Sequence, residues 1–180
     1  SELHTQGSLL HEMRERYINE ARETVDGLVG SLVGRPIDIK YYAGWDSEQA
    51  LGDVISANEE SDRNRGFTGQ GPHRADLRFK VDGASVQNVL SRGESKLFIA
   101  AVLLAQTAHV MQSTGITPVV LIDDLASELD VMNRQRLLSV IHDVGAQTFL
   151  TAVSGDVLPR SAWRQQKVFH VEQGLLQEVV

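Results

Sequence analysis

The chain has 180 residues, of which 42% are hydrophobic, no cysteine and a formal net charge of −7. This composition fits a soluble globular protein with one sizeable core, and the lack of cysteine excludes a disulfide framework and thiolate metal sites. Lys96, His109 and Gln112 interrupt or bound the longest apolar run, which stays below the roughly 18 residues of a membrane span, and no secretory signal is present. We therefore expect a cytoplasmic protein without membrane contact.

Apolar residues at steps of three and four predict a long amphipathic helix over residues 8–33, ended by Gly34, Arg35 and Pro36. "IDIKYYA" (37–43) predicts a strand, and residues 47–65 predict a polar helix with Ser47 as its N-cap. The apolar face of the first helix consists of Leu10, Met13, Tyr17, Ala21, Val25, Leu28 and Leu32.

Three glycines and a proline make residues 66–74 a loop. The stretch 75–87 then predicts a β-hairpin, because Asp82-Gly83 is a pair favoured in type I′ turns. "LSRGESKLFIAAVLLAQTAHVMQ" (90–112) predicts a polar turn and a helix that is apolar nearly all round. We expect this helix to be buried on most sides.

The last part of the chain predicts an α/β arrangement. "TPVVLIDD" (117–124) is expected to be a central parallel strand, residues 131–145 a helix stopped by Gly145, and 146–153 a second buried strand. Together they predict a βαβ unit. Residues 167–180 predict a closing antiparallel hairpin at a sheet edge.

Two acids, Asp123 and Asp124, follow the first of these strands. Side chains at the carboxyl end of a parallel strand project into the crevice where α/β folds bind ligands. Asp123 there could hold a hard cation such as Mg²⁺, and Asp124 could orient or deprotonate an attacking water. The alternative is an acid pair that ends the strand and caps the next helix.

A second motif, "LSRGE" (90–94), comes just before the long apolar helix. Ser91 supplies a hydroxyl, Gly93 allows close approach of a ligand to the backbone, and the free N–H groups of a helix start favour an anion such as a phosphate. An ordinary N-cap at Ser91 is the alternative.

The order and spacing of the two motifs match the signature motif, Walker B motif and D-loop of ABC-type ATPases; Gly93 and Asp123 are 30 positions apart (123 − 93). Within that class the chain resembles the RecF family of bacterial recombinational-repair ATPases, which are related to the structural-maintenance-of-chromosomes proteins. The resemblance is carried by "GPHRADLRF" (71–79), "LSRGESKL" (90–97) and "LIDDLASELD" (121–130).

The resemblance implies an α/β fold, the C-terminal part of an ABC-type ATPase head, in which the P-loop half of the P-loop NTPase fold is missing. Residues 1–35 would be the end of an adjoining helical lobe and residues 36–180 the head portion. A Gly-x4-Gly-Lys-Ser/Thr loop is absent, since "GLVGSLVG" and "GFTGQG" both lack the Lys-Ser/Thr step. The chain also begins Ser-Glu-Leu, so we expect a portion of a longer protein that is inactive by itself.

The resemblance also implies roles for single residues. Ser91, Arg92 and Gly93 would contact the γ-phosphate of an ATP bound mainly by a second subunit. Asp123 would lie in the Mg²⁺ shell, and Asp124 would be the catalytic carboxylate. The dimer interface at the D-loop would comprise Ser127, Glu128, Leu129 and Asp130.

The chain departs from the family pattern at two places. Glu94 stands where many signature motifs have Gln, and a carboxylate near a phosphate is unfavourable unless it points away or pairs with Arg92 or Lys96. The usual switch histidine is absent, and "TFLTAVSGD" offers Thr151 and Ser154 in its place.

Residues 63–96 carry seven basic and three acidic side chains, whereas the segments before and after them are acidic. This segment is suited to a polyanion, although a solvated charged surface explains it equally well. In the resemblance His73 and Arg74 are the sharpest DNA-binding candidates, joined by Arg78 and Lys80; a loop-anchoring role fits His73 and Arg74 as well.

The implied function is ATP-driven dimerisation that clamps gapped DNA during recombinational repair, with slow hydrolysis. The implied cofactors are ATP and Mg²⁺, used only with the missing half. The implied partners are single-stranded/double-stranded gapped DNA, the recombination mediators RecR and RecO, and a second copy in an ATP-dependent homodimer. A non-catalytic interaction module, or an ATPase of another branch of the structural-maintenance superfamily, are the alternatives.

Overall fold

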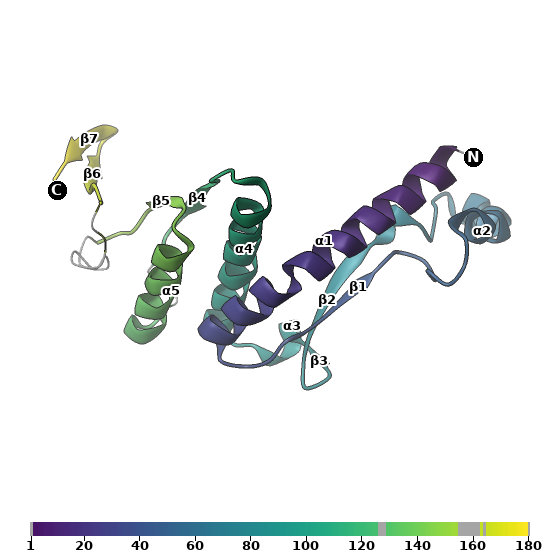
Figure 1. Ribbon diagram of the computed structural model, residues 1–180, viewed down its shortest axis with the longest axis horizontal. Coiled ribbons are helices and arrows are strands. Elements are labelled where there is room, and N and C mark those ends of the chain that lie inside the picture. The colour runs from purple at the N-terminus through teal and green to yellow at the C-terminus, as the bar shows by residue number, and fades with distance from the viewer. Residues whose placement is uncertain (1, 126–128, 155–162, 164, 180) are drawn as a thin grey trace.

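The computed structural model describes residues 2–125, 129–154, 163 and 165–179. The molecule is elongated, with the two termini at opposite ends (Figure 1). Helix α1 (Glu2–Val33) runs along one half of it, and α4 (Arg92–Thr114) and α5 (Val131–Val144) stand side by side in the other half. Helix α1 therefore runs from the N-terminal end of the molecule to the pair of α4 and α5, and the C-terminal strands lie beyond that pair.

Helix α1 has the predicted amphipathic face, but only part of that face is covered. Its C-terminal half packs on α4 and α5 and buries Val29, Leu32 and Val33. Towards the N-terminus the same face is open, with Leu10, Met13 and Tyr17 exposed. The sequence period fixed the face of the helix, whereas its burial depends on the neighbours present along it.

A three-stranded antiparallel sheet runs beside α1, in the order β1 (Asp38–Tyr42), β2 (Asp76–Val81) and β3 (Ala84–Ser85). Asp82 and Gly83 both have positive φ, 50° and 81°, which confirms the type I′ turn. The second strand of this hairpin is shorter than predicted, because a turn of helix, α3 (Val86–Val89), takes over from Val86.

The polar helix α2 (Leu51–Arg65) begins later than predicted. Ala50, not Ser47, is its N-cap and makes no side-chain cap hydrogen bond. The Asp46 carboxylate instead accepts the Glu48 N–H (3.2 Å) and holds the preceding residues in a turn. A short 3₁₀ helix, η1 (Pro72–Arg74), lies in the glycine-rich loop that follows α2.

Helix α4 is confirmed, but the expectation that most of its sides are buried was wrong. Leu97, Phe98, Ala101, Leu104, Ala105 and His109 are buried, while Ile99 and Leu103 are each 56% exposed. Among the described residues, α4 is the one helix that is long and apolar enough, by length and composition alone, to cross a membrane. This was not indicated by the sequence, because only apolar runs that no polar residue interrupts were considered. Its packing against α1 and α5 makes it the core helix of this fold.

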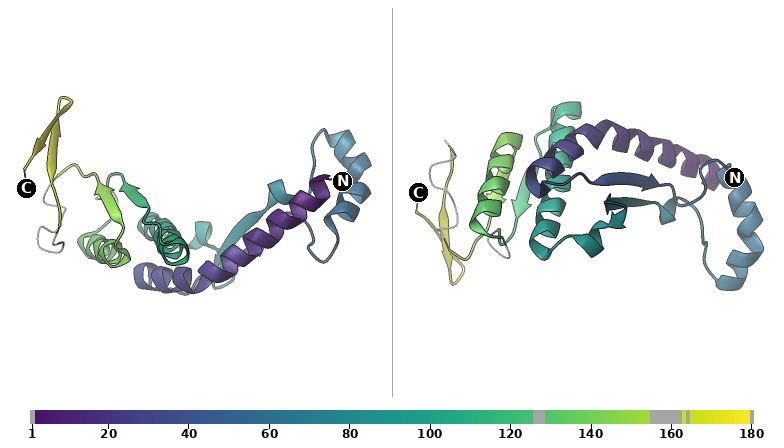
Figure 2. Two further views of the ribbon diagram at one scale, coloured as in Figure 1. Left: turned by 45° about the horizontal axis from the view of Figure 1, so that its top comes forward. Right: turned by 90° about the horizontal axis from the view of Figure 1, so that it is seen from below.

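The βαβ unit is confirmed: β4 (Val119–Ile122) and β5 (Gln147–Leu150) are parallel, in the register Val119↔Gln147, and α5 connects them. Figure 2 shows α4 and α5 on one side of these strands. The prediction of a central, buried strand was wrong for the described chain, because β4 pairs with β5 alone and Leu121 is 75% exposed.

Strands β6 (Phe169–Glu172) and β7 (Leu175–Glu178) form the predicted hairpin, with Gln173 and Gly174 at positive φ in its turn. They form a separate two-stranded sheet and do not border β4–β5, so the predicted position at a sheet edge was wrong. The hairpin lies at the end of the molecule opposite to the N-terminus (Figure 1).

Buried apolar residues form two clusters. The larger cluster joins α4 and α5 to the end of α1, through Val29, Leu32 and Val33. The smaller one holds Ala43 and Trp45 against α2. The larger core contains residues from both sides of residue 35. The predicted division of the chain into residues 1–35 and 36–180 stays a prediction.

Candidate functional site

The acid pair at the end of β4 is held by a residue from the end of β5. Thr151 bonds to β4 through its N–H, which donates to the Ile122 carbonyl (2.9 Å), and its carbonyl accepts the Leu125 N–H (3.1 Å). The Thr151 hydroxyl accepts the Asp124 N–H (2.8 Å) and donates to the Asp123 carboxylate. The two strand ends are thereby joined into one unit, the acid clasp of Asp123, Asp124 and Thr151.

The acid clasp leaves both carboxylates accessible, since Asp123 and Asp124 are exposed. Asp124 has a positive φ of 48°, a conformation that Asp adopts more readily than most residues. The alternative in which this pair caps the following helix was wrong: Asp130 is the N-cap of α5, and its carboxylate accepts the Asn133 N–H (2.8 Å).

The oxygen atoms of the acid clasp suit a hard cation only in part. Two carboxylates and a hydroxyl are ligands of the kind that Mg²⁺ takes. Among the described residues, however, no group of three or more His, Cys, Asp or Glu side chains is arranged to hold a metal ion. The clasp fits a Mg²⁺ that is bound mainly by phosphates and touches the protein through one or two carboxylates.

The predicted D-loop is described only in part. Ser127 and Glu128 lie outside the described residues. The Leu129 side chain is 7% exposed and lies in the larger core, while its carbonyl accepts from Arg134 Nη2 (3.3 Å). Asp130 caps α5. A contact of Leu129 with a second subunit would therefore use its backbone, whereas the Asp130 carboxylate is already engaged within the chain.

The start of α4 carries a capping box. The Ser91 hydroxyl accepts the Glu94 N–H (3.3 Å), and the Glu94 carboxylate accepts the Ser91 N–H (2.9 Å). Ser91 is thus an N-cap, as the alternative proposed, and its position also leaves it exposed at the helix start. Arg92 is exposed and Gly93 partly so, which leaves the positive end of the helix dipole accessible to an anion.

Glu94 is turned to the capping box and not to the space where an anion would bind. Its other oxygen lies 3.6 Å from Nη2 of Arg35, the residue that joins α1 to β1. The hydrogen bonds from Ser91, and to a smaller degree the Arg35 charge, lower the pKa of Glu94. The sequence suggested Arg92 or Lys96 as partners, and missed Arg35 because it is 59 positions away (94 − 35).

The loop before β2 holds His73 and Arg74. His73 Nε2 lies 2.9 Å from the Thr68 carbonyl, a loop-anchoring contact that requires the proton on Nε2. The Arg74 guanidinium lies 5.4 Å from the centre of the Phe67 ring. Both residues are exposed. The structure thus gives His73 an anchoring role and leaves Arg74 available to a ligand.

Strands β1 and β2 share an outer face that carries three cations and two acids, here called the basic face. Arg78 and Lys80 are two residues apart on β2, and the register places Lys40 of β1 directly opposite Arg78. The acids are Asp38, opposite Lys80, and Asp76, opposite Tyr42. Arg78 also lies over the Tyr42 ring, at 4.4 Å from its centre. Two cations opposite one another destabilise a sheet unless an anion is shared between them. Lys40 was missed by sequence reasoning because only the strand register brings it to Arg78.

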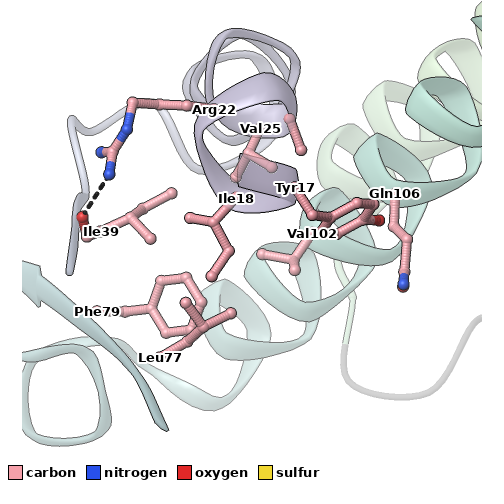
Figure 3. Close-up of a pocket in the computed structure, with 10 residues that line it drawn as sticks. Tyr17, Ile18, Arg22, Val25, Ile39, Leu77, Phe79, Val102 and Gln106 are labelled. Carbon is pink, nitrogen blue, oxygen red and sulfur yellow. Dashed lines mark hydrogen bonds between the residues drawn. The ribbon is translucent and has the colours of Figure 1, made fainter. Parts of the chain in front are cut away.

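An apolar pocket of about 140 Å³ lies between α1, α4 and the other face of this sheet. Figure 3 shows Ile18, Phe79 and Val102 pointing into it, and the Arg22 guanidinium turned to the Ile39 carbonyl, 3.1 Å away. None of the sequence-predicted site residues lines this pocket. It is a gap in the packing between helix and sheet, separate from the acid clasp.

The RecF/RecN/SMC N-terminal domain model matches residues 4–177. The DNA replication and repair protein RecF of Vibrio cholerae serotype O1 is 36% identical over 170 residues, which cover 94% of this chain and 47% of the relative. The RecF protein of Thioalkalivibrio sulfidiphilus is 36% identical over 171 residues, covering 94% and 48%. The chain thus spans about half the length of the curated relatives it matches.

Two solved structures share the fold. The recombination mediator protein RecF-ATP in the RecFOR pathway has a TM-score of 0.77 at 20% identity, covering 99% of this chain and 48% of that one. RecF-ATPrS has a TM-score of 0.75 at 18% identity, covering 97% and 47%. The fold is that of part of an ABC-type ATPase head, and the chain belongs to the RecF/RecN/SMC N-terminal domain family, in which its relatives are RecF proteins.

Proposed function

We propose that this chain supplies part of the ATP site of a RecF-like DNA-repair ATPase, in which ATP drives two copies together around DNA. The acid clasp carries this proposal. It places two accessible carboxylates at the carboxyl end of a parallel strand, fixed by a hydroxyl from the next strand.

In the proposed reaction Asp124 orients the attacking water and accepts its proton. Asp123 is the residue that would hold Mg²⁺, which supplies charge neutralisation at the phosphates. Thr151 keeps both residues in place. It is also the first candidate for the role of the missing switch histidine, and Ser154 is the second. Asp124 is one methylene shorter than the Glu of many ABC ATPases, which agrees with slow turnover.

The second copy would present its α4 start to the γ-phosphate. Ser91, Arg92 and Gly93 lie at the exposed N-terminus of a 23-residue helix, where N–H groups and the helix dipole favour an anion. Glu94 does not oppose this, because its charge is turned to the Ser91 N–H and to Arg35. Ser127, Glu128, Leu129 and Asp130 are proposed for the same dimer contact.

A P-loop would have to come from a segment outside these 180 residues. The described chain leaves apolar surface for such a segment: Val119, Leu121 and Phe149 are exposed on one face of β4–β5. Parallel sheets are normally covered on both faces. Ile99 and Leu103 add an exposed apolar strip on α4.

DNA is the proposed polyanion, held through its phosphates by the basic face of β1–β2 and by Arg74. Arg78, Lys80 and the newly found Lys40 form that face. His73 contributes by anchoring the loop. RecR and RecO are the proposed protein partners, with gapped DNA as the substrate and the cytoplasm as the location; the similar solved structures are described as part of the RecFOR pathway.

The test compares Asp124→Asn with the wild type in the full-length protein. We expect the variant to keep ATP-dependent dimerisation, measured by light scattering, and to lose hydrolysis by about a hundredfold or more, measured by phosphate release. Asp143→Asn is the matched control, since Asp143 is an exposed acid on α5 beside His142. Normal hydrolysis by Asp124→Asn would refute the catalytic assignment and favour a non-catalytic interaction module.

A further inference from the structure

Phe67 is an exposed aromatic residue in the loop that follows α2. It comes one residue after Gly66, the C-cap of that helix, and is 53% exposed. The guanidinium carbons of Arg65 and Arg74 lie 5.5 and 5.4 Å from the centre of its ring. An aromatic ring at the surface is therefore accompanied by two cations from different parts of the chain.

The loop is held in place from three sides. The Arg14 guanidinium of α1 donates to the Pro72 carbonyl (2.8 Å), and the Gly71 N–H donates to the Gly44 carbonyl after β1 (3.0 Å). The Asp62 carboxylate of α2 accepts the Gly69 N–H (3.1 Å). Phe67 is thus presented by a loop whose shape is fixed before any ligand binds, which lowers the entropic cost of binding.

The two arginines differ in how their charge is compensated. Arg65 forms an ion pair with Asp62 at 2.8 Å, so its main role is to hold the loop and the ring. In the part of the chain that the structure describes, Arg74 makes no ion pair and no side-chain hydrogen bond, and its recorded side-chain contact is the Phe67 ring. Of the five basic side chains between residues 63 and 80, Arg63 and Arg65 are paired with acids of α2, and Lys80 lies opposite Asp38.

An exposed ring beside an uncompensated guanidinium matches the chemistry of an unpaired nucleotide. Arg74 lies over the ring in the unbound chain. On binding, its guanidinium can turn from the ring to the phosphate, and the base can stack on the ring in its place. Bases inside a duplex stack on each other and offer no face to such a ring. An acidic peptide would satisfy Arg74 but would make no use of Phe67, so an unpaired DNA strand is the better match.

We propose that Phe67, with Arg65 and Arg74, forms a stacking platform for an unpaired base, the Phe67 platform, which makes the protein prefer gapped DNA to fully paired duplex. Arg74 connects the platform to the basic face of β1–β2, because β2 begins two residues after it. This inference rests on the proposed DNA-binding function and adds to it the feature of DNA that is recognised.

The experiment measures binding of the full-length protein to a gapped duplex and to a fully paired duplex of equal length, by fluorescence anisotropy at one salt concentration. We expect Phe67→Ala to weaken binding to gapped DNA by roughly five- to a hundredfold, towards the affinity for paired duplex, and to leave duplex binding unchanged. Phe67→Trp keeps the preference, because its ring can also stack. In the wild type, 2-aminopurine at the unpaired position changes its fluorescence on binding, and this change is lost in Phe67→Ala.

Two controls separate the platform from general effects. Phe169→Ala removes another exposed phenylalanine, on β6 at the far end of the molecule. Arg16→Gln removes an exposed positive charge of α1. Both variants should keep the preference for gapped DNA. A Phe67→Ala protein that keeps the preference, or that weakens binding to both DNAs equally, overturns the platform alone. A wild type that binds neither DNA overturns the proposed DNA-binding function and the platform with it.

Discussion

At the scale of single residues, Thr151 is the residue on which the arrangement of the acids depends. Its hydroxyl serves Asp124 as an acceptor and Asp123 as a donor, and a hydrogen bond to a charged carboxylate is stronger than one between neutral groups. Because its one proton is donated to Asp123, this hydroxyl has none to offer a phosphate while the acid clasp is formed.

We predict that Thr151→Val lowers the free energy of unfolding by about 1–2 kcal/mol, because the Asp124 N–H and the Asp123 carboxylate both lose a partner. The same variant should reduce ATP hydrolysis by the full-length protein, since the acids are no longer held. Urea unfolding and phosphate release measure the two effects. Thr148→Val on the same strand is the control, because its hydroxyl bonds only to the Ala146 carbonyl, and it should hydrolyse ATP normally.

Glu94 gives the stability a dependence on pH. The hydrogen bonds from Ser91, and to a smaller degree the Arg35 charge, hold its pKa in the folded protein below the ordinary value of a glutamate. A carboxyl with a lowered pKa stabilises the fold above its unfolded pKa, and this contribution is lost as the pH falls through the folded pKa. We predict that Glu94→Gln is less stable than the wild type at neutral pH, that the difference narrows as the pH falls below 4.5, and that it is lost once the pH has fallen through the lowered pKa of the folded protein.

Urea unfolding at stepwise lower pH checks this prediction. Glu23→Gln, at an exposed position of α1, is the control for the loss of one negative charge. A difference between Glu94→Gln and the wild type that stays constant down to the lowest pH would show that the charge of Glu94 has no part in the capping box.

At the scale of elements, two glycines in the N-terminal half lie where neighbouring segments pack very close together. A Cβ at Gly7 of α1 would lie 2.5 Å from Leu51 Cδ2 of α2 and 2.9 Å from Pro72 Cγ of η1. A Cβ at Gly44, where φ is +100°, would lie 2.0 Å from the Gly71 carbonyl oxygen. The loop that carries Phe67 and Arg74 therefore approaches two glycines, Gly7 through the Pro72 ring and Gly44 through its own backbone, at distances that leave no room for a side chain.

We predict that Gly44→Ala lowers the free energy of unfolding by about 2 kcal/mol or more, because both the φ angle and the Gly71 carbonyl oppose a side chain. Gly30→Ala in α1 is the matched control. A Cβ at Gly30 meets nothing within 4 Å, so the helix should gain about 0.5–1 kcal/mol. Urea unfolding of both variants measures the two opposite shifts, and equal shifts would contradict the described packing around Gly44.

At the scale of the whole molecule, the parallel sheet has one covered and one open face. Val120, Ile122 and Leu150 pack on the larger core, while Val119, Leu121 and Phe149 on the opposite face are exposed. The chain spans about half the length of its RecF relatives. The open face is consistent with a covering segment from the rest of such a protein.

We predict that Leu121→Lys changes the stability of this 180-residue chain by less than about 0.5 kcal/mol, because the residue is 75% exposed in it. In the full-length protein the same change should cost about 3 kcal/mol, since a covering segment would bury the added charge. Leu175→Lys on β7 is the matched control at 76% exposure and should be neutral in both. An equally small effect of Leu121→Lys in the full-length protein would show that the face stays open there.

Local physical chemistry in the sequence was enough for most elements and for the site motifs. The helical spacing of apolar residues predicted α1, and the pair Asp82-Gly83 predicted the turn between β2 and β3. Gly145 predicted the end of α5. Each of these signals acts within a few residues of the chain. The order and spacing of the motifs at Gly93 and Asp123 likewise predicted a nucleotide site, and that assignment stays a prediction.

Only the tertiary structure decided which groups meet. Thr151 joins Asp123 and Asp124, Arg35 pairs with Glu94, and Lys40 lies opposite Arg78. It also showed that α4, predicted to be buried on most sides, and β4, predicted to be a central strand, each leave apolar residues exposed. A sequence pattern shows how apolar the surface of a helix or strand is, but whether that surface is buried depends on the elements that pack on it. Contacts between residues that are distant in the chain arise only when the fold brings them together.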